Sequence, residues 1–210
     1  MRGVKLPRRD APQRVRNEVN MTLYSLALFL HVGSALTLAS ALSIDGLILF
    51  QLRRATTATA THPWLNLWSA VPRIAGGSGF LLLFPGAYLT KRMSAWTLPW
   101  PKMALATLIL IAILGAITSK RMGVLRQVCA PGKTGELECA RRLQDPILKV
   151  SLGTRIALLF AAVLLMNAQP ALWESLAIVV GSLALGSIAA LIIPSSSSDS
   201  AATNSNARSW

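Results

Sequence analysis

Five apolar stretches, each about long enough to cross a lipid bilayer, occupy most of this 210-residue chain between Thr22 and Ile193. A transmembrane helix needs about 20 apolar residues, because each residue rises about 1.5 Å through a hydrocarbon core of about 30 Å. Inside that core, a single backbone segment can satisfy its own hydrogen bonds only by coiling into a helix. The sequence therefore predicts an all-α fold, a polytopic membrane helical bundle with five transmembrane helices.

The predicted spans lie near residues 22–45, 68–90, 101–119, 152–169 and 172–193. The last two are separated only by the four residues NAQP, so one long, kinked helix is an alternative to two spans. A hairpin is favoured, because proline fits a tight turn better than a helix interior. A single continuous helix would also be far longer than a bilayer is thick.

The flanks of the predicted bundle, which covers residues 21–193, differ from it in composition. Residues 1–20 are basic, contain two prolines and lack an apolar run, so no cleaved secretory signal is predicted there. We expect a disordered N-terminal extension, and Met21 fits the start of a membrane protein because an apolar stretch follows it. Residues 194–210 form a Ser-rich tail with too little apolar surface to fold, and we expect this tail to be disordered.

Composition and charge support lipid as the main partner of the chain. The sequence is 53% hydrophobic and only 14% charged, with a mean hydropathy of +0.51, which is more apolar than a soluble domain of this length. The net charge of +13 comes from the N-terminal extension and the connections, and no nucleic-acid recognition motif accompanies it. The basic residues are therefore interpreted as topology signals beside anionic lipid, and no nucleic-acid partner is predicted.

The same basic residues indicate an orientation. With five spans, the connections after the first and the third span lie on one side of the membrane, and both are basic. The positive-inside rule makes that side cytoplasmic, with the N-terminus outside and the C-terminus inside. The basic N-terminal extension resists translocation, a conflict that disappears if Met21 is the start. The predicted location is the bacterial inner (plasma) membrane, as a multi-pass protein.

The long connection after the third span contains both cysteines of the chain, Cys129 and Cys139. On the cytoplasmic side they would stay reduced, whereas outside they could close a small disulfide loop, and the topology favours unpaired thiols. Two cysteines without a nearby histidine make a poor metal site. The connection also favours a short helix with Thr134 as its N-cap, ended by Asp145-Pro146.

Three ionisable residues lie where predicted spans begin or end. Burying a charge in lipid is costly, so each such residue needs a partner or a function. Asp45 ends the first span, Arg73 begins the second and Arg155 begins the fourth, all on the cytoplasmic side. We expect these three residues to form one intramembrane cluster, because pairing offsets much of the cost of burying each charge alone. The cluster is interpreted either as a structural clamp or as a site that binds or gates a substrate or ion.

His31 lies near the middle of the first span, about 13 Å from its start. An imidazole at this depth could ligate haem or another metal, or transfer protons near neutral pH. The alternative is a hydrogen bond that joins the first helix to its neighbour. His62 is the only other histidine and lies in a connection, so a second axial haem ligand would be a methionine or come from another subunit.

Small residues and tryptophans indicate further contacts. Glycines within the run AGGSG of the second span, and Ser182 with Gly186 in the fifth, predict close approach between helices. AGGSG lacks the Gly-Lys-Ser/Thr ending of a phosphate loop. Five tryptophans fall near predicted span ends, as an aromatic belt at the membrane interface requires: Trp64, Trp68, Trp96, Trp100 and Trp173.

Three weakly specific motifs support a resemblance to known proteins: Leu-His-Val around His31, Trp-x-x-Pro-Trp over residues 96–100, and Asp145-Pro146 before the fourth span. With them, most of residues 21–193 resembles a group of uncharacterised bacterial integral inner-membrane proteins. That group is loosely similar to the CopD-like superfamily, which includes copper-resistance membrane proteins and a haem-binding protoporphyrinogen oxidase. In the haem-binding relatives a first-helix histidine is functional, so the resemblance implies a functional role for His31.

Two classes of function follow. The first is an integral membrane protein, a small transport or stress-related component, that binds through Asp45, Arg73 and Arg155. The alternative is a haem- or copper-binding membrane redox protein that uses His31. No catalytic signature is evident, so enzymatic activity is left open. Besides the lipid bilayer, a second copy of the chain or a partner membrane subunit could cover the helix faces, since these suit lipid and protein equally.

Overall fold

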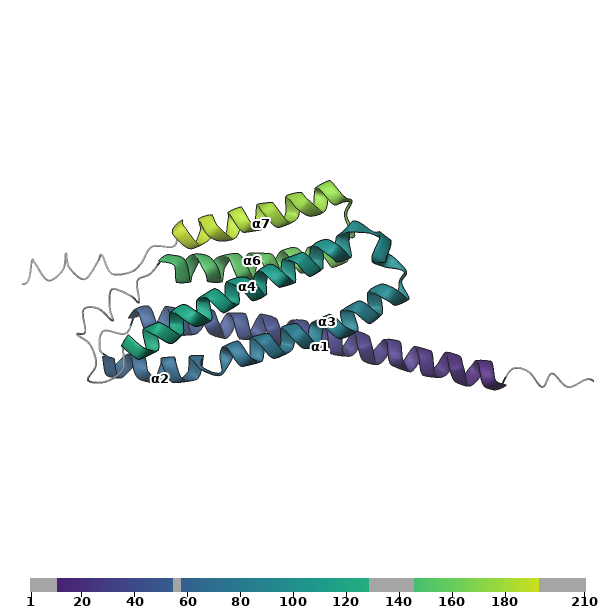
Figure 1. Ribbon diagram of the computed structural model, residues 1–210, viewed down its shortest axis with the longest axis horizontal. Helices are drawn as coiled ribbons and strands as arrows, with labels where there is room; N and C mark the ends of the chain where they lie inside the picture. Colours follow the sequence, from purple (N-terminus) through teal and green to yellow (C-terminus); the bar gives the residue numbers. More distant parts are fainter. Residues whose placement is uncertain (1–10, 55–57, 129–145, 193–210) are drawn as a thin grey trace, which may run out of the picture.

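The computed structural model describes residues 11–54, 58–128 and 146–192, and these residues form helices and no strand. Five helices are long and apolar enough to cross a membrane, which confirms the prediction of an all-α, five-span bundle. In chain order the elements are α1 (Ala11–Arg54), α2 (Ala58–Trp68), α3 (Val71–Arg92), the 3-10 turn η1 (Ala95–Thr97), α4 (Pro99–Val128), α6 (Pro146–Ala168) and α7 (Leu172–Ile192) (Figure 1).

Several predictions concern segments beyond these residues. The disorder expected for residues 1–10 and for the Ser-rich tail 194–210 lies outside the described part of the chain. The same holds for Cys129, Cys139 and the short helix expected between Thr134 and Asp145. These features stay predictions.

The first helix begins earlier than the sequence predicted. α1 spans 44 residues, about 66 Å of helix, and its first residue is Ala11, within the segment expected to be a disordered extension. The prediction is therefore wrong for residues 11–20. The physical reason is that Pro12 sits in the first helical turn, where proline is tolerated, and the following residues include good helix formers such as arginine, glutamine and glutamate.

The second span begins before the predicted range of 68–90 and consists of two helices. α2 ends at Trp68 and α3 begins at Val71, so the break falls at Ser69 and Ala70. Pro72 stands in the first turn of α3, where its missing N–H leaves no helical hydrogen bond unmade. Together the two helices supply a membrane-spanning segment from Pro63 to Arg92.

The fourth and fifth spans form the hairpin that was favoured over one kinked helix. α6 ends at Ala168, and Gln169 adopts a left-handed backbone conformation with φ of 47°. Its backbone N–H donates to Leu165 O at 3.1 Å, which closes the helix end. The backbone N–H of Ala171 donates to Glu174 Oε2 at 3.2 Å, so this carboxylate caps the beginning of α7.

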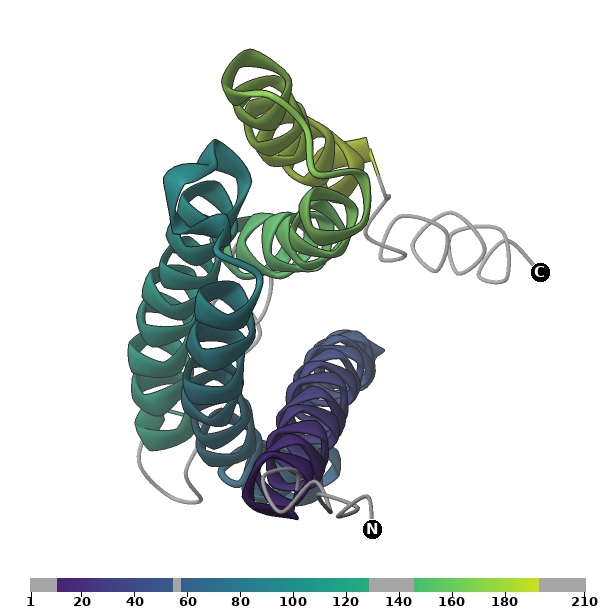
Figure 2. The same ribbon diagram turned by 90° about the vertical axis from the view of Figure 1, so that its right-hand side faces the viewer.

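The helices follow one another around an arc, which Figure 2 shows from one end of the bundle. α1 packs along α3, α4 packs along α6, and α6 packs along α7, whereas contacts between α3 and α4 and between α1 and α6 are much sparser. The bundle therefore consists of an α1–α3 pair and an α4–α6–α7 group. The turn η1 connects the two at one end, and the opposite end contains the core.

The main hydrophobic core lies at the end of the bundle where α1 ends, α4 ends and α6 begins. Its buried residues are Ala41, Ile48, Leu49, Leu52, Leu65, Trp68, Val71, Met122, Leu125 and Leu148. Along the spans, by contrast, large apolar side chains such as Phe29, Phe160 and Leu185 are exposed. Lipid provides as favourable an environment as another helix for such side chains, so the spans need no continuous core.

The tightest helix contact joins α6 and α7. A Cβ atom built on Gly186 would lie 2.7 Å from Thr154 Cα and 2.8 Å from Gly153 O, so only glycine fits there. This confirms the close approach expected at Gly186. Hydroxyl contacts also join these helices. Thr154 Oγ1 lies 3.2 Å from Ser187 Oγ between α6 and α7, and Thr118 Oγ1 lies 2.7 Å from Ser151 Oγ between α4 and α6.

Candidate functional site

A buried ion pair joins α1 to α6. Arg155 Nη1 donates to Asp45 Oδ2 at 2.9 Å, and the two side chains are 6% and 9% exposed. The residues are 110 positions apart in sequence, and the structure brings them together as the sequence analysis expected. A charge pair this well buried is costly to desolvate, and it is strongly destabilising to break because the remaining charge is left without a partner.

Trp68 also donates a hydrogen bond to Asp45, a role that was not predicted from the sequence. The indole Nε1–H at the end of α2 donates to Asp45 Oδ1 at 2.7 Å, so both carboxylate oxygens accept a hydrogen bond. Trp68 is 7% exposed and belongs to the hydrophobic core, whereas Trp96 and Trp173 are exposed near span ends. The expectation that Trp68 anchors the membrane interface is therefore wrong, because its ring points inward.

Arg73 does not take part in the cluster. Its side chain is exposed and forms no hydrogen bond or ion pair with any residue that the structure describes. The reason is helical geometry: Arg73 follows the buried Val71 by two residues, or about 200° around α3, and therefore lies on the opposite face. The expected meeting of three charges is corrected to two charges and an indole.

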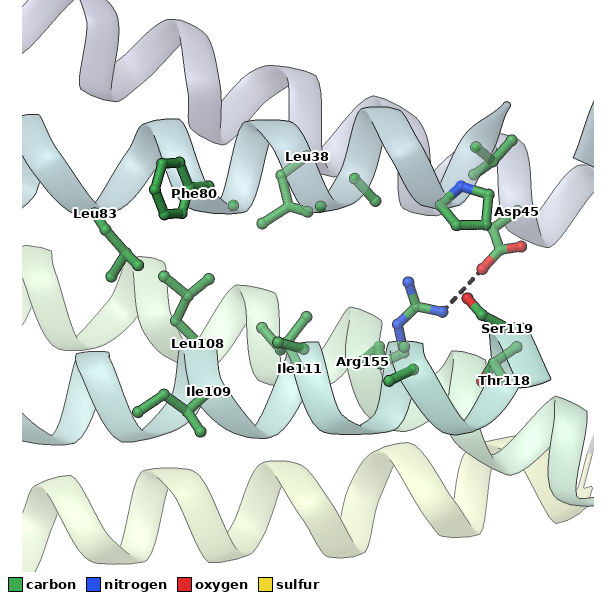
Figure 3. A pocket seen from close by; sticks show the side chains of 18 of the residues that line it. Leu38, Asp45, Phe80, Leu83, Leu108, Ile109, Ile111, Thr118, Ser119 and Arg155 are labelled. Carbon is green, nitrogen blue, oxygen red and sulfur yellow. Dashed lines mark hydrogen bonds and ion pairs between the residues drawn. The ribbon is translucent and has the colours of Figure 1, made fainter. Parts of the chain in front are cut away.

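A cavity of about 410 Å³ lies between α3 and α4 and ends at the ion pair. Figure 3 shows Asp45 and Arg155 at one end of it, and Phe80, Leu83 and Leu108 at the other. The α3 residues that line it run from Val71 to Leu83, a helix length of about 18 Å. Phe80, Leu83 and Ile109 are exposed at its rim, so the cavity opens sideways where the spans face lipid.

Small residues on both helices keep this space open. Ala75, Gly76 and Gly79 line it from α3, and Ala112, Gly115 and Ala116 line it from α4. A Cβ atom built on Gly76, Gly77 or Gly79 would meet nothing within 4 Å. The close helix contact expected at AGGSG is therefore absent from the structure. The glycines of α3 widen a cavity, because α3 and α4 stay apart along this stretch.

Arg155 has donor capacity that the protein does not use. Nη1 is paired with Asp45, whereas Nε and Nη2 make no hydrogen bond to a described residue. Nε is enclosed by surrounding atoms, and Nη2 is not. Ser119 also lines this end of the cavity, and its hydroxyl makes no hydrogen bond to a described residue. Buried polar groups are nearly always paired, so an orphaned arginine N–H beside a cavity needs an explanation.

The ion pair lies near the basic end of the spans. In α4, Ser119 lines the cavity and is followed at once by Lys120 and Arg121. In α1, Arg53 and Arg54 follow Asp45 within nine residues. The cavity therefore extends from a polar end, close to the level where the helices become charged, into the apolar part of the bundle.

His31 holds α1 against α3. Its Nδ1 lies 3.3 Å from Leu82 O, and because a carbonyl only accepts, Nδ1 carries the proton and donates. The ring also touches the Cα face of Gly86, where an added Cβ would lie 3.1 Å from His31 Cε1. Pro85, inside α3, lacks the N–H that would pair with Leu81 O, the carbonyl one residue before the one that His31 contacts.

The described residues around His31 form no cluster of metal-ligating side chains. Within the described ranges, no group of three or more His, Cys, Asp and Glu side chains comes together in a way that could hold a metal ion. Nδ1 donates to Leu82 O, Nε2 makes no hydrogen bond to a described residue, and His31 is not among the residues that line the cavity between α3 and α4. The helix-joining alternative matches the contact of Nδ1, and haem or copper ligation through Nε2 stays a prediction.

Replacement of His31 tests this assignment. His31→Ala removes one interhelical hydrogen bond, so we expect a modest loss of about 0.6–2 kcal/mol in the free energy of unfolding, measured in detergent micelles. His31→Gln, which keeps a donor, should lose less. An absorbance spectrum of the purified protein is the control: a Soret band in the wild type that disappears in His31→Ala would contradict the structural role.

No protein-family model, curated protein or solved structure matches this chain. The resemblance to the uncharacterised inner-membrane group and the CopD-like superfamily therefore stays a prediction.

Proposed function

We propose that this protein is a multi-pass protein of the bacterial inner membrane that takes a lipophilic molecule from the bilayer into the cavity between α3 and α4. It would act as a small transport component, with its basic end in the cytoplasm and its N-terminus outside. The cavity with a buried Asp45–Arg155 pair at one end is the observation that supports this proposal most.

The dimensions and chemistry of the cavity suit a ligand. Small-molecule sites in proteins are typically about 300–1,000 Å³, mostly apolar, with a few well-placed polar groups. This cavity has a volume of about 410 Å³, and its polar groups are concentrated at the Arg155 end. Its sideways opening faces the lipid-exposed side of the spans, so a molecule dissolved in the bilayer could enter without crossing water.

A purely structural clamp accounts for less of the site. The Asp45–Arg155 pair alone would hold α1 against α6. It does not account for the small residues that keep α3 and α4 apart, nor for the Nη2 N–H groups of Arg155, which have no partner among the described residues. A ligand that fills the cavity accounts for all three features, and the binding hypothesis is preferred for that reason.

Filling the cavity with a side chain provides the test. Gly79→Leu places four carbons into the space between α3 and α4, where an added Cβ meets nothing within 4 Å. We expect it to reduce labelling of α3 and α4 by a photoreactive lipophilic probe, a diazirine-bearing alkyl chain, at least about fivefold in nanodiscs, since the probe and the leucine compete for the same volume. Mass spectrometry of labelled peptides measures the effect.

Gly77→Leu is the matched control. Gly77 lies two residues away on the same helix, has equally open space around it and does not line the cavity. Both variants replace a helical glycine and should gain similar helix propensity, about 1 kcal/mol. Equal labelling of the Gly79→Leu and Gly77→Leu proteins would contradict binding in the cavity.

A further inference from the structure

The hydrogen-bonding pattern at the end of the cavity points to the chemistry of the ligand. Resting on the function proposed above, we infer that the ligand is a single-chain amphiphile whose polar end is an uncharged hydrogen-bond acceptor, a carbonyl group, held against Arg155. Its apolar chain lies between α3 and α4.

The charge at this end of the cavity is already balanced. Asp45 contributes one negative charge and Arg155 one positive charge, and the two are in direct contact. An anionic head group placed beside them would leave a net negative charge in a buried site, which is costly inside a membrane. A cationic head group would leave a net positive charge in the same buried site, and each Asp45 oxygen already accepts a hydrogen bond from Trp68 or Arg155.

The unused groups are donors. The Nη2 N–H groups of Arg155 have no partner among the described residues and are not closed off from the cavity, and the Ser119 hydroxyl at the same end is likewise free to donate to a ligand. In Figure 3 both side chains lie at the Asp45 end of the cavity. A carbonyl oxygen has two lone pairs and no hydrogen to donate, so it satisfies these donors without bringing a charge or a donor of its own.

The position of these donors fits the way an amphiphile lies in a bilayer. The donors are near the level where α1 and α4 become basic, and the apolar walls extend about 18 Å from Val71 to Leu83 toward the other end of α3. A membrane amphiphile likewise holds its polar end near the interface and its chain in the hydrocarbon core. Such a molecule could move sideways into the cavity without turning over.

Probes that share one diazirine-bearing chain and differ in their polar ends test the inference in nanodiscs. The probes are an n-alkane, a methyl ester, an alkyl sulfonate and a phosphatidylcholine, each with a terminal diazirine on a chain of the same length. We expect the methyl ester to label the cavity helices about tenfold more than the alkane, the ratio that one hydrogen bond to a charged donor would give. The sulfonate and the phosphatidylcholine should label no better than the alkane.

Asp45→Asn gives a second and independent readout. The asparagine oxygen can still accept one hydrogen bond, but the end of the cavity now carries the uncompensated charge of Arg155. We therefore expect the preference to reverse, with the sulfonate labelling more than the methyl ester. If this variant fails to fold, the ester-to-sulfonate ratio in the wild type decides the question alone.

The outcomes separate this inference from the proposed function. Equal labelling by the ester, alkane and sulfonate, all blocked by Gly79→Leu, would leave the cavity as a lipophile site and overturn the carbonyl assignment. Preferential labelling by the sulfonate would overturn the charge argument. Equal labelling by the phosphatidylcholine and the ester would show that bulk bilayer lipid fills the site and would overturn a selective single-chain ligand. Labelling that is unaffected by Gly79→Leu would contradict both proposals.

Discussion

Asp45→Leu is expected to destabilise the protein by about 3–5 kcal/mol, because it leaves the guanidinium of Arg155 buried without its counter-charge. It also removes the acceptor of the Trp68 indole. The double variant Asp45→Leu with Arg155→Met replaces both charges by apolar groups and should recover most of the loss. Unfolding by denaturant in detergent micelles, followed by circular dichroism, measures the free energies of the wild type, the two single variants and the double variant. These four values complete a double-mutant cycle that isolates the interaction.

Arg73→Met is the control for this cycle. Arg73 is exposed and has no contact with Asp45, so its replacement should change the free energy of unfolding by less than about 0.5 kcal/mol. Combined with Asp45→Leu, Arg73→Met should not restore any of the stability that Asp45→Leu removes. Rescue by Arg73→Met equal to that by Arg155→Met would show that the pairing described here is wrong.

Gly186→Leu should lower the free energy of unfolding by a similar amount, about 3 kcal/mol or more, through a different mechanism. Even the Cβ atom of the new residue would lie 2.7 Å from Thr154 Cα and 2.9 Å from Ala157 Cβ, so α7 must move away from α6. The displacement would also break the hydroxyl contact between Thr154 and Ser187. Thermal unfolding in detergent and proteolysis in the α6–α7 hairpin measure the loss.

Gly181→Leu provides the comparison within the same helix. Gly181 has no atom within 4 Å of an added Cβ, so the same change of glycine to leucine meets lipid or detergent there. It should leave stability unchanged or raise it by up to about 1 kcal/mol through helix propensity. Similar losses for the two variants would mean that the α6–α7 contact does not depend on the glycine at position 186.

The spans and the ion pair could be predicted from sequence because each depends on strong, local rules. Apolar length alone defines the five spans. Asp45 and Arg155 each stand near the end of a span on the same side, and a buried charge in lipid requires a partner, so their meeting follows from depth and charge. Arg73 satisfied the same two criteria and failed on a third, its rotation around α3, which depends on where the break after Trp68 falls.

Two features of the site could not be predicted because one residue type serves opposite roles. An indole near a span end fits the membrane interface as well as an inward hydrogen bond, and only the packing of α2 decides between them for Trp68. Gly76 and Gly79 fit a close helix contact as well as a cavity wall. The distance between α3 and α4 decides that question, and it is set by η1 at one end and the core at the other.

One wall of the cavity contains the residue types at which helices bend. α3 carries Gly76, Gly77 and Gly79 followed by Pro85, the residue types at which helices bend, while both of its ends are held by neighbouring elements. α3 separates the opening of the cavity from α1, which packs along it. We therefore expect the width of this opening to depend on any bend of α3, in addition to the small residues that line it.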